Sequence, residues 1–173
     1  MKRLVRLTVN GLAHDIAAAP HETLLAVLRR ELDLFSVREG CGIGLCGACT
    51  VLIDGKPISS CLTLAALAAG KQIETLESLS PDGALHPIQQ AFVDNAAFQC
   101  SYCTPGFILT TKALLAENPT PSPDDIREYL AGNLCRCGSY VKIMGAVLDA
   151  AGRLRAEHAT RARNQARETG TIS

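Results

Sequence analysis

Residues 40–51 of the chain read GCGIGLCGACTV, and a further cysteine, Cys61, follows Cys49 after eleven intervening residues. Four glycines and three cysteines therefore make up more than half of this twelve-residue stretch. Glycine adopts positive φ angles and lets the backbone approach a bound group closely. The stretch predicts a loop that wraps around something held by thiols, between a helix before it and a strand after it.

The spacing of these four cysteines, x4 then x2 then x11, is the plant-type pattern for a 2Fe-2S cluster. Cys41, Cys46 and Cys49 lie within nine residues and Cys61 stands alone, whereas zinc motifs usually present paired short spacings. Glycines at this density would let backbone N–H groups point at the sulfurs and offset their negative charge. The loop also matches the dinucleotide motif G-x-G-x-x-G. We reject that interpretation because the motif must follow a strand and open a helix.

A second set comprises Cys100, Cys103, Cys135 and Cys137. Two of these residues lie just before predicted helices that begin at Thr104 and near Tyr140. Anionic thiolates are favoured there by the exposed N–H groups and the positive end of the helix dipole. Spacing alone leaves two interpretations open, a structural zinc site and a second cluster. A Cys135–Cys137 disulfide would close a small strained ring, which disfavours it.

The composition excludes several other classes of protein. The 17 Lys and Arg balance 17 Asp and Glu, whereas a nucleic-acid binder needs a positive surplus. The first eleven residues lack the unbroken apolar core of a secretory signal, and no window is apolar enough to span a membrane. We therefore expect a cytoplasmic protein, in which clustered thiols serve as metal ligands or redox groups rather than disulfides.

The first half of the chain has the pattern of a small sheet wrapped on a helix. Period-two alternation predicts strands over residues 4–9, 12–17, 50–53, 56–59 and 72–75. Asn10-Gly11 and Asp54-Gly55 are typical hairpin turns. Thr23 is placed to cap a helix whose apolar residues follow at helical spacing.

The second half predicts only helices. Strand signals disappear after residues 76–84, and helix starts follow at Pro87, Thr104, Pro123 and Tyr140, the last helix ending near Arg155. The sequence thus predicts an α+β protein with a small sheet-and-helix domain over 1–78 and a helical domain over 79–156. From residue 157 to 173 the polar sequence predicts a flexible tail.

At these residues the chain resembles the small iron-sulfur subunit of the xanthine oxidase family of molybdenum hydroxylases. The matching motifs are residues 40–51, DGK at 54–56, SCLTL at 60–64, FQCSYCTPG at 98–106 and GNLCRC at 132–137. The resemblance implies an N-terminal plant-ferredoxin-like (β-grasp) domain and a C-terminal four-helix bundle. It implies a 2Fe-2S cluster in each, with all eight cysteines as ligands, and so favours a cluster over zinc for the second set.

The resemblance also implies a role and partners. Gln99 and Cys137 match residues that contact molybdopterin cytosine dinucleotide, which a large subunit holds, and a medium subunit commonly binds FAD. The chain would then transfer electrons within a hetero-oligomer and carry no catalytic residue itself. Two departures from the commoner motif are Ser101 in place of Gly and Gly138-Ser139-Tyr140 in place of Thr-Gly-Tyr.

Other residues and other functions offer alternatives to this interpretation. We interpret the four histidines, His14, His21, His86 and His158, as surface or capping residues, because eight cysteines suffice for two clusters. A stand-alone two-cluster ferredoxin and a zinc-binding interaction module are the rival functions.

Overall fold

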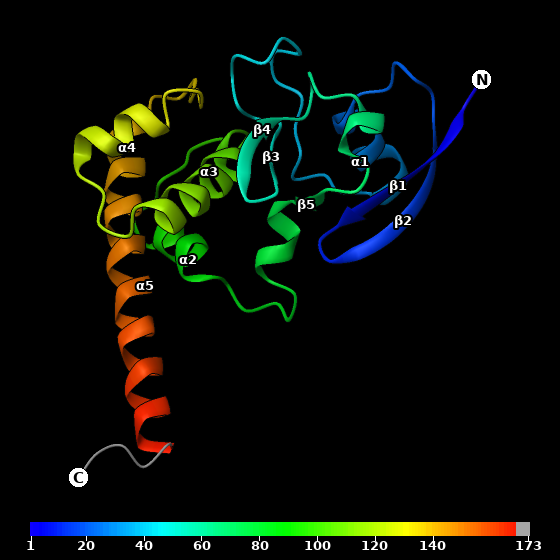
Figure 1. The fold of residues 1–173 in the computed structure, drawn as a ribbon. Helices are drawn as coiled ribbons and strands as arrows, with labels where there is room; N and C mark the ends of the chain where they lie inside the picture. Colours follow the sequence, from blue (N-terminus) through cyan, green and yellow to red (C-terminus); the bar gives the residue numbers. More distant parts are fainter. Residues whose placement is uncertain (169–173) are drawn as a thin grey trace.

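Two tight hairpins form most of the sheet in the computed structural model, which describes residues 1–168 (Figure 1). Its five strands are β1 (Arg3–Val9), β2 (Leu12–Ala18), β3 (Thr50–Ile53), β4 (Lys56–Ser59) and β5 (Gln72–Glu74). They lie in the order β2-β1-β5-β3-β4. β5 runs parallel to β1 and antiparallel to β3. The strand predictions are confirmed, with ends that shift by at most one residue.

The hairpin turns have the backbone geometry that their sequences predict. Asn10 and Gly11 have φ angles of 52° and 81°, and Asp54 and Gly55 have φ angles of 51° and 80°. Positive φ at both central residues gives the turn twist that matches the twist of the flanking strands. Asn and Asp tolerate this conformation and Gly adopts it without strain.

β3, the strand that follows the cysteine loop, is buried on both faces. Val51 and Ile53 belong to the core under α1 (Leu24–Leu32), whereas Leu52 belongs to the core of the helices in the second half. Successive side chains of a strand point to opposite faces, so the two cores lie on the two sides of β3. β3 therefore separates the two cores and contributes side chains to both.

The second half contains α2 (Pro87–Asp94), α3 (Thr104–Glu117), α4 (Pro123–Tyr129) and α5 (Tyr140–Glu168). Their common core includes Phe92, Phe107, Ile126 and Val147. The predicted helix starts are confirmed. Two 3-10 turns, η1 (Ala65–Ala68) and η2 (Leu76–Leu79), precede these helices, and Leu79 packs in their core. The division at residues 78 and 79 stays a prediction.

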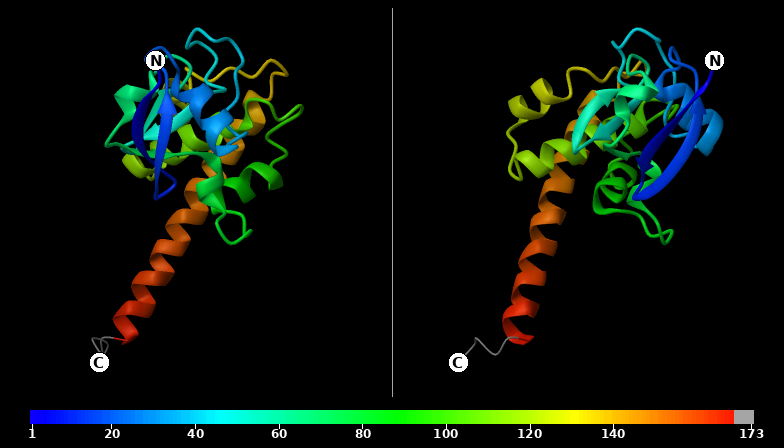
Figure 2. Two further views of the ribbon diagram at one scale, coloured as in Figure 1. Left: turned by 90° about the vertical axis from the view of Figure 1, so that its right-hand side faces the viewer. Right: turned by 45° about the vertical axis from the view of Figure 1, so that its right-hand side comes forward.

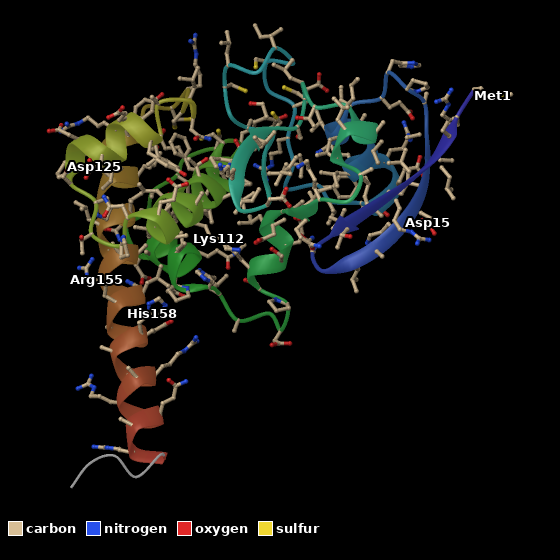
Figure 3. All side chains as sticks on the ribbon, in the orientation of Figure 1. Met1, Asp15, Lys112, Asp125, Arg155 and His158 are labelled. Atoms are coloured by element: carbon tan, nitrogen blue, oxygen red, sulfur yellow. The ribbon has the colours of Figure 1, made fainter. Side chains whose placement is uncertain are left out.

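α5 is longer than the sequence pattern predicts. It continues to Glu168 and projects away from the other elements (Figure 2), so the predicted end near Arg155 is wrong. Residues 156–168 contain no Gly or Pro and are rich in Ala and Arg, which favour a helix without any apolar period. Figure 3 shows Arg155 and His158 along this part. The flexibility of residues 157–168 stays a prediction, and residues 169–173 lie outside the described chain.

Polar contacts also join the two halves. Lys112 of α3 pairs with Glu74 of β5, and Figure 3 shows Lys112 between the helices and the sheet. Within the first half, Glu77 accepts hydrogen bonds from the backbone N–H and the hydroxyl of Ser36, at 3.0 and 2.6 Å. Burial opposes ionisation of Glu77, but the donors Ser36 and Thr75 hold its pKa below the usual range.

No helix within residues 1–168 is long and apolar enough to cross a membrane.

His86 caps α2 through a ring nitrogen and should make stability depend on pH. Its Nδ1 accepts from the N–H of Ile88 at 3.2 Å, which requires a neutral ring. Burial, then the charge of Lys112, lowers the pKa of His86. The cap is therefore intact above about pH 6.5, the ordinary histidine pKa, and is lost as the pH falls through the lower folded-state pKa.

We predict that His86→Asn removes this pH dependence, because asparagine caps a helix without titrating. Between pH 7.5 and 5 the wild type should lose about 1 kcal/mol relative to the variant, or roughly 2–4 °C in apparent melting temperature. Thermal unfolding at a series of pH values measures this. Parallel curves for the two proteins would contradict the assignment.

Candidate iron-sulfur sites

The first cysteine set converges at the loop of residues 40–49 and the end of β4. The N–H of Leu45 lies 3.4 Å from Cys41 Sγ, and the N–H groups of Ile43, Leu45 and Cys46 lower the pKa of Cys41 to about 7. The Cys41 thiol also interacts with that of Cys46. Backbone donors thus stabilise the thiolate form that a metal requires.

The other two thiols of this set, those of Cys49 and Cys61, are buried. Cys49 and Cys61 are 2% and 8% exposed. Burial, then the neighbouring Cys49 thiol, raises the pKa of Cys61 to about 11, and Cys61 also interacts with Cys41. Within this set a Cβ on Gly40 would come to 2.8 Å from Cys46 Sγ. The four thiols are therefore neighbours, and a side chain at Gly40 would displace the Cys46 sulfur.

The second set converges at the N-termini of α3 and α5. Cys103 is the residue before α3, and burial, then the neighbouring Cys135, raises its pKa to about 12. Cys100 is exposed, and the N–H of Tyr102, then the thiol of Cys137, lowers its pKa. Burial opposes ionisation of Cys135, but the N–H of Ser139, 3.5 Å from its Sγ, helps to hold its pKa below the usual range.

The chemistry of this second pocket suits a sulfur-rich group. All eight cysteines are free thiols. The hydroxyls of Thr104 and Ser139, both close in sequence to these cysteines, are buried and make no hydrogen bond of normal geometry among residues 1–168, and the Ser139 side chain helps to lower the pKa of Cys135. Hydroxyl donors of this kind can bond to thiolate or sulfide. In the described part of the chain, no group of three or more His, Cys, Asp and Glu is arranged to hold a single metal ion.

A cavity of about 590 Å³ lies between the two sets. Its walls include Cys41 and Cys46 of the first set and Cys100, Cys103 and Cys135 of the second. At this boundary the carbonyl of Cys46 accepts a hydrogen bond from the N–H of Leu134 at 3.0 Å. Leu134 precedes Cys135, so one hydrogen bond connects the backbones of the two cysteine sets.

The backbone at Gly47 forms the tightest contact between the halves. Its carbonyl accepts from Nδ2 of Asn133 at 3.3 Å, and a Cβ on Gly106 of α3 would overlap this carbonyl oxygen. A Cβ on Gly47, which has φ +67°, would overlap Asn133. Only glycine at both positions lets α3 lie directly on the first cysteine loop.

A second contact at this boundary is one that the sequence pattern did not reveal. Arg38 donates to the carbonyl of Ser101, and its guanidinium lies 5.4 Å from the centre of the Tyr102 ring. The Tyr102 hydroxyl donates to the carbonyl of Glu39 at 2.7 Å. Ser101 has φ +62°, so a commoner Gly at this place has a backbone reason. The Ser at position 101, in place of the commoner Gly, was the sign in the sequence that this backbone position is unusual. The partner Arg38, 63 residues away, left none.

The two residues predicted to contact a pterin lie together on the surface. Gln99 is exposed and its Nε2 donates to the carbonyl of Cys137 at 3.0 Å. Cys137 is half-buried and interacts with exposed Cys100. The assignment of these residues, and of the eight cysteines as ligands, stays a prediction.

Comparisons with known proteins agree with this arrangement. Residues 7–79 match the 2Fe-2S iron-sulfur cluster binding domain, and residues 75–148 match the [2Fe-2S] binding domain. The chain is 47% identical over 146 residues to the nicotinate dehydrogenase small FeS subunit of Eubacterium barkeri, covering 84% of this chain and 93% of that protein. It is 49% identical over 148 residues to the xanthine dehydrogenase iron-sulfur-binding subunit of Escherichia coli O157:H7, covering 84% and 92%.

Solved structures of related oxidoreductases contain the same fold as this chain. A chain of quinoline 2-oxidoreductase from Pseudomonas putida 86 superimposes with a TM-score of 0.86 at 41% identity, covering 90% of this chain and 97% of that one. Aldehyde oxidoreductase from Desulfovibrio desulfuricans superimposes with a TM-score of 0.84 at 45% identity, covering 89% of this chain and 17% of that one. Fold and sequence thus define a protein with two 2Fe-2S-binding domains. The chain belongs to the iron-sulfur subunits of the xanthine oxidase family of molybdenum hydroxylases, and is part of an oxidoreductase.

The Gly106 contact predicts opposite effects of one substitution at two helical glycines. Gly106→Ala should destabilise the chain by about 1–3 kcal/mol, because the added methyl pushes α3 off the cysteine loop. Gly152→Ala in α5, where a Cβ meets nothing within 4 Å, should stabilise it by about 0.5–1 kcal/mol. Thermal unfolding of both variants measures the difference. Stabilisation by Gly106→Ala would show that the contact does not exist.

Proposed function

We propose that this chain relays electrons between a molybdenum centre, held by a large partner protein, and a flavin or other acceptor. A bound 2Fe-2S cluster takes up and releases one electron at a time. The chain's own residues supply the thiolate ligands, bury them and donate hydrogen bonds to sulfur, which together set the potential. The observation that carries the proposal is the meeting of two four-cysteine sets at one cavity.

The direction of transfer is part of the proposal. Gln99 and Cys137 lie together on the surface beside the second set, which supports entry of electrons there from molybdopterin cytosine dinucleotide in the large subunit. The N–H of Leu134 on the carbonyl of Cys46 supports onward transfer, because it joins the two sets through few bonds. Electrons would leave from the first set towards FAD in a medium subunit.

The surface around both sets supports docking on other subunits. Around the first set Ile43, Leu45 and Leu62 are each more than 60% exposed. Around the second, Leu134 and Tyr140 are about half exposed and Val141 is 86% exposed. Exposed apolar residues gathered at one site are typical of a protein interface. Together they support a hetero-oligomer with a partner at each end.

Three finer expectations from the sequence belong to the same proposal. They are a β-grasp form for the first domain, a four-helix bundle for the second, and a cytoplasmic location. The mixed sheet over α1 and the common core of α2 to α5 support the first two.

Substituting one ligand in each set tests the assignment. Cys49→Ser should abolish one 2Fe-2S signal in the EPR spectrum of the reduced protein and leave the other, because each set holds its own cluster. Cys135→Ser, the matched control, should abolish the other signal instead. Loss of both signals from either variant, or a colourless and EPR-silent wild type, would contradict the two-cluster assignment.

The oligomeric state tests the subunit role separately. Gel filtration of the protein purified from its host should give a complex that contains both a large and a medium subunit. If the protein instead elutes alone near 18.3 kDa and carries both clusters, the stand-alone ferredoxin is favoured.

A further inference from the structure

Ser139 has a buried hydroxyl group that makes no hydrogen bond of normal geometry in the described chain. The residue is 5% exposed, and within residues 1–168 its side chain acts on the thiol of Cys135, whose pKa it helps to lower. Buried hydroxyls are almost always hydrogen-bonded, since an unsatisfied one has lost its water without replacement. The group that the Ser139 hydroxyl is placed to bond is the sulfur of Cys135.

The usual role of a serine at this position is absent. Ser139 precedes α5, and its carbonyl accepts from the N–H of Ile143 at 2.9 Å, which makes it the N-cap residue. An N-cap serine normally uses its Oγ to accept from an N–H of the first turn. Ser122 does so at the start of α4, where its Oγ accepts from Asp125 at 3.2 Å. The hydroxyl of Ser139 makes no such bond and is free to donate elsewhere.

The surroundings of Ser139 are the second cysteine set. Its own N–H lies 3.5 Å from Cys135 Sγ, and Cys137 is two residues before it. The commoner family motif has glycine at this place, which carries no side chain. Ser139 thus places a hydroxyl donor beside these thiols.

We propose that the Ser139 hydroxyl donates a hydrogen bond to sulfur at Cys135 when the second cluster is bound, and so raises the reduction potential of that cluster. This inference rests on the proposed function only in requiring a 2Fe-2S cluster in the second set. Reduction adds one electron to the cluster, and no bond breaks and no proton moves. An O–H dipole aimed at sulfur stabilises the reduced cluster more than the oxidised cluster, because the reduced cluster carries one more negative charge.

A redox titration followed by EPR tests this in the complex purified with its own subunits, using dithionite as reductant. Ser139→Ala should lower the one-electron reduction constant of the second cluster by up to about tenfold, which corresponds to about 59 mV. The midpoint of the first cluster should not change. Ser139→Thr, which keeps the hydroxyl, should keep the wild-type midpoint.

Thr110→Val is the matched control. The Thr110 hydroxyl is also buried without a partner in residues 1–168, but it lies in α3, seven residues beyond Cys103. This variant removes an equivalent group and should leave both midpoints unchanged. If Thr110→Val and Ser139→Ala change the midpoint of the second cluster equally, the change comes from looser packing of the helices in general. That result would overturn the proposal.

Two failures are distinguishable. A Ser139→Ala midpoint equal to that of the wild type overturns the inference, whereas absence of a second 2Fe-2S signal from the wild type overturns the proposed function as well. If Ser139→Ala does not hold the cluster, Ser139→Gly replaces it, since the commoner motif holds a cluster with glycine there. The same downward shift is then expected, and its absence overturns the inference.

Discussion

The close backbone contact at Gly47 fixes the geometry on which the rest of the molecule depends. Its carbonyl lies against Gly106 and accepts from Asn133, while the adjacent Cys46 carbonyl accepts from Leu134. Each of these residues lies within three positions of a cysteine. The Gly106–Gly47 and Leu134–Cys46 contacts join backbone to backbone, so no flexible side chain lies between the two segments there.

The strand and the helix that follow the two cysteine sets pack against each other. β3 begins directly after the first cysteine loop and is covered on one face by α1 and on the other by α3. The same α3 begins directly after Cys103. Sheet and helices therefore position the cysteines from both sides of one buried strand, and the contacts of Arg38 with Ser101 and Tyr102 reinforce that boundary.

Local signals predicted most of the fold and the cysteine sets. Asn10-Gly11 and Asp54-Gly55 determine their own φ angles, and Ser122 and Pro123 define a helix start through groups that lie within one turn. The contacts between the halves left no such signal, because the Asn133 to Gly47 bond joins residues 86 apart. The end of α5 was predicted wrongly for another reason. The prediction relied on apolar periodicity, whereas the last part of α5 has no such period and is helical through the helix propensity of its residues.

The central proposal is that two 2Fe-2S clusters lie close together on the two sides of the Gly47 contact. EPR spectra of the purified complex, recorded as it is reduced stepwise, test this most directly. We predict two distinct 2Fe-2S signals whose lines split by magnetic coupling once both clusters are reduced. A single signal, or two signals that remain unsplit at full reduction, would contradict it.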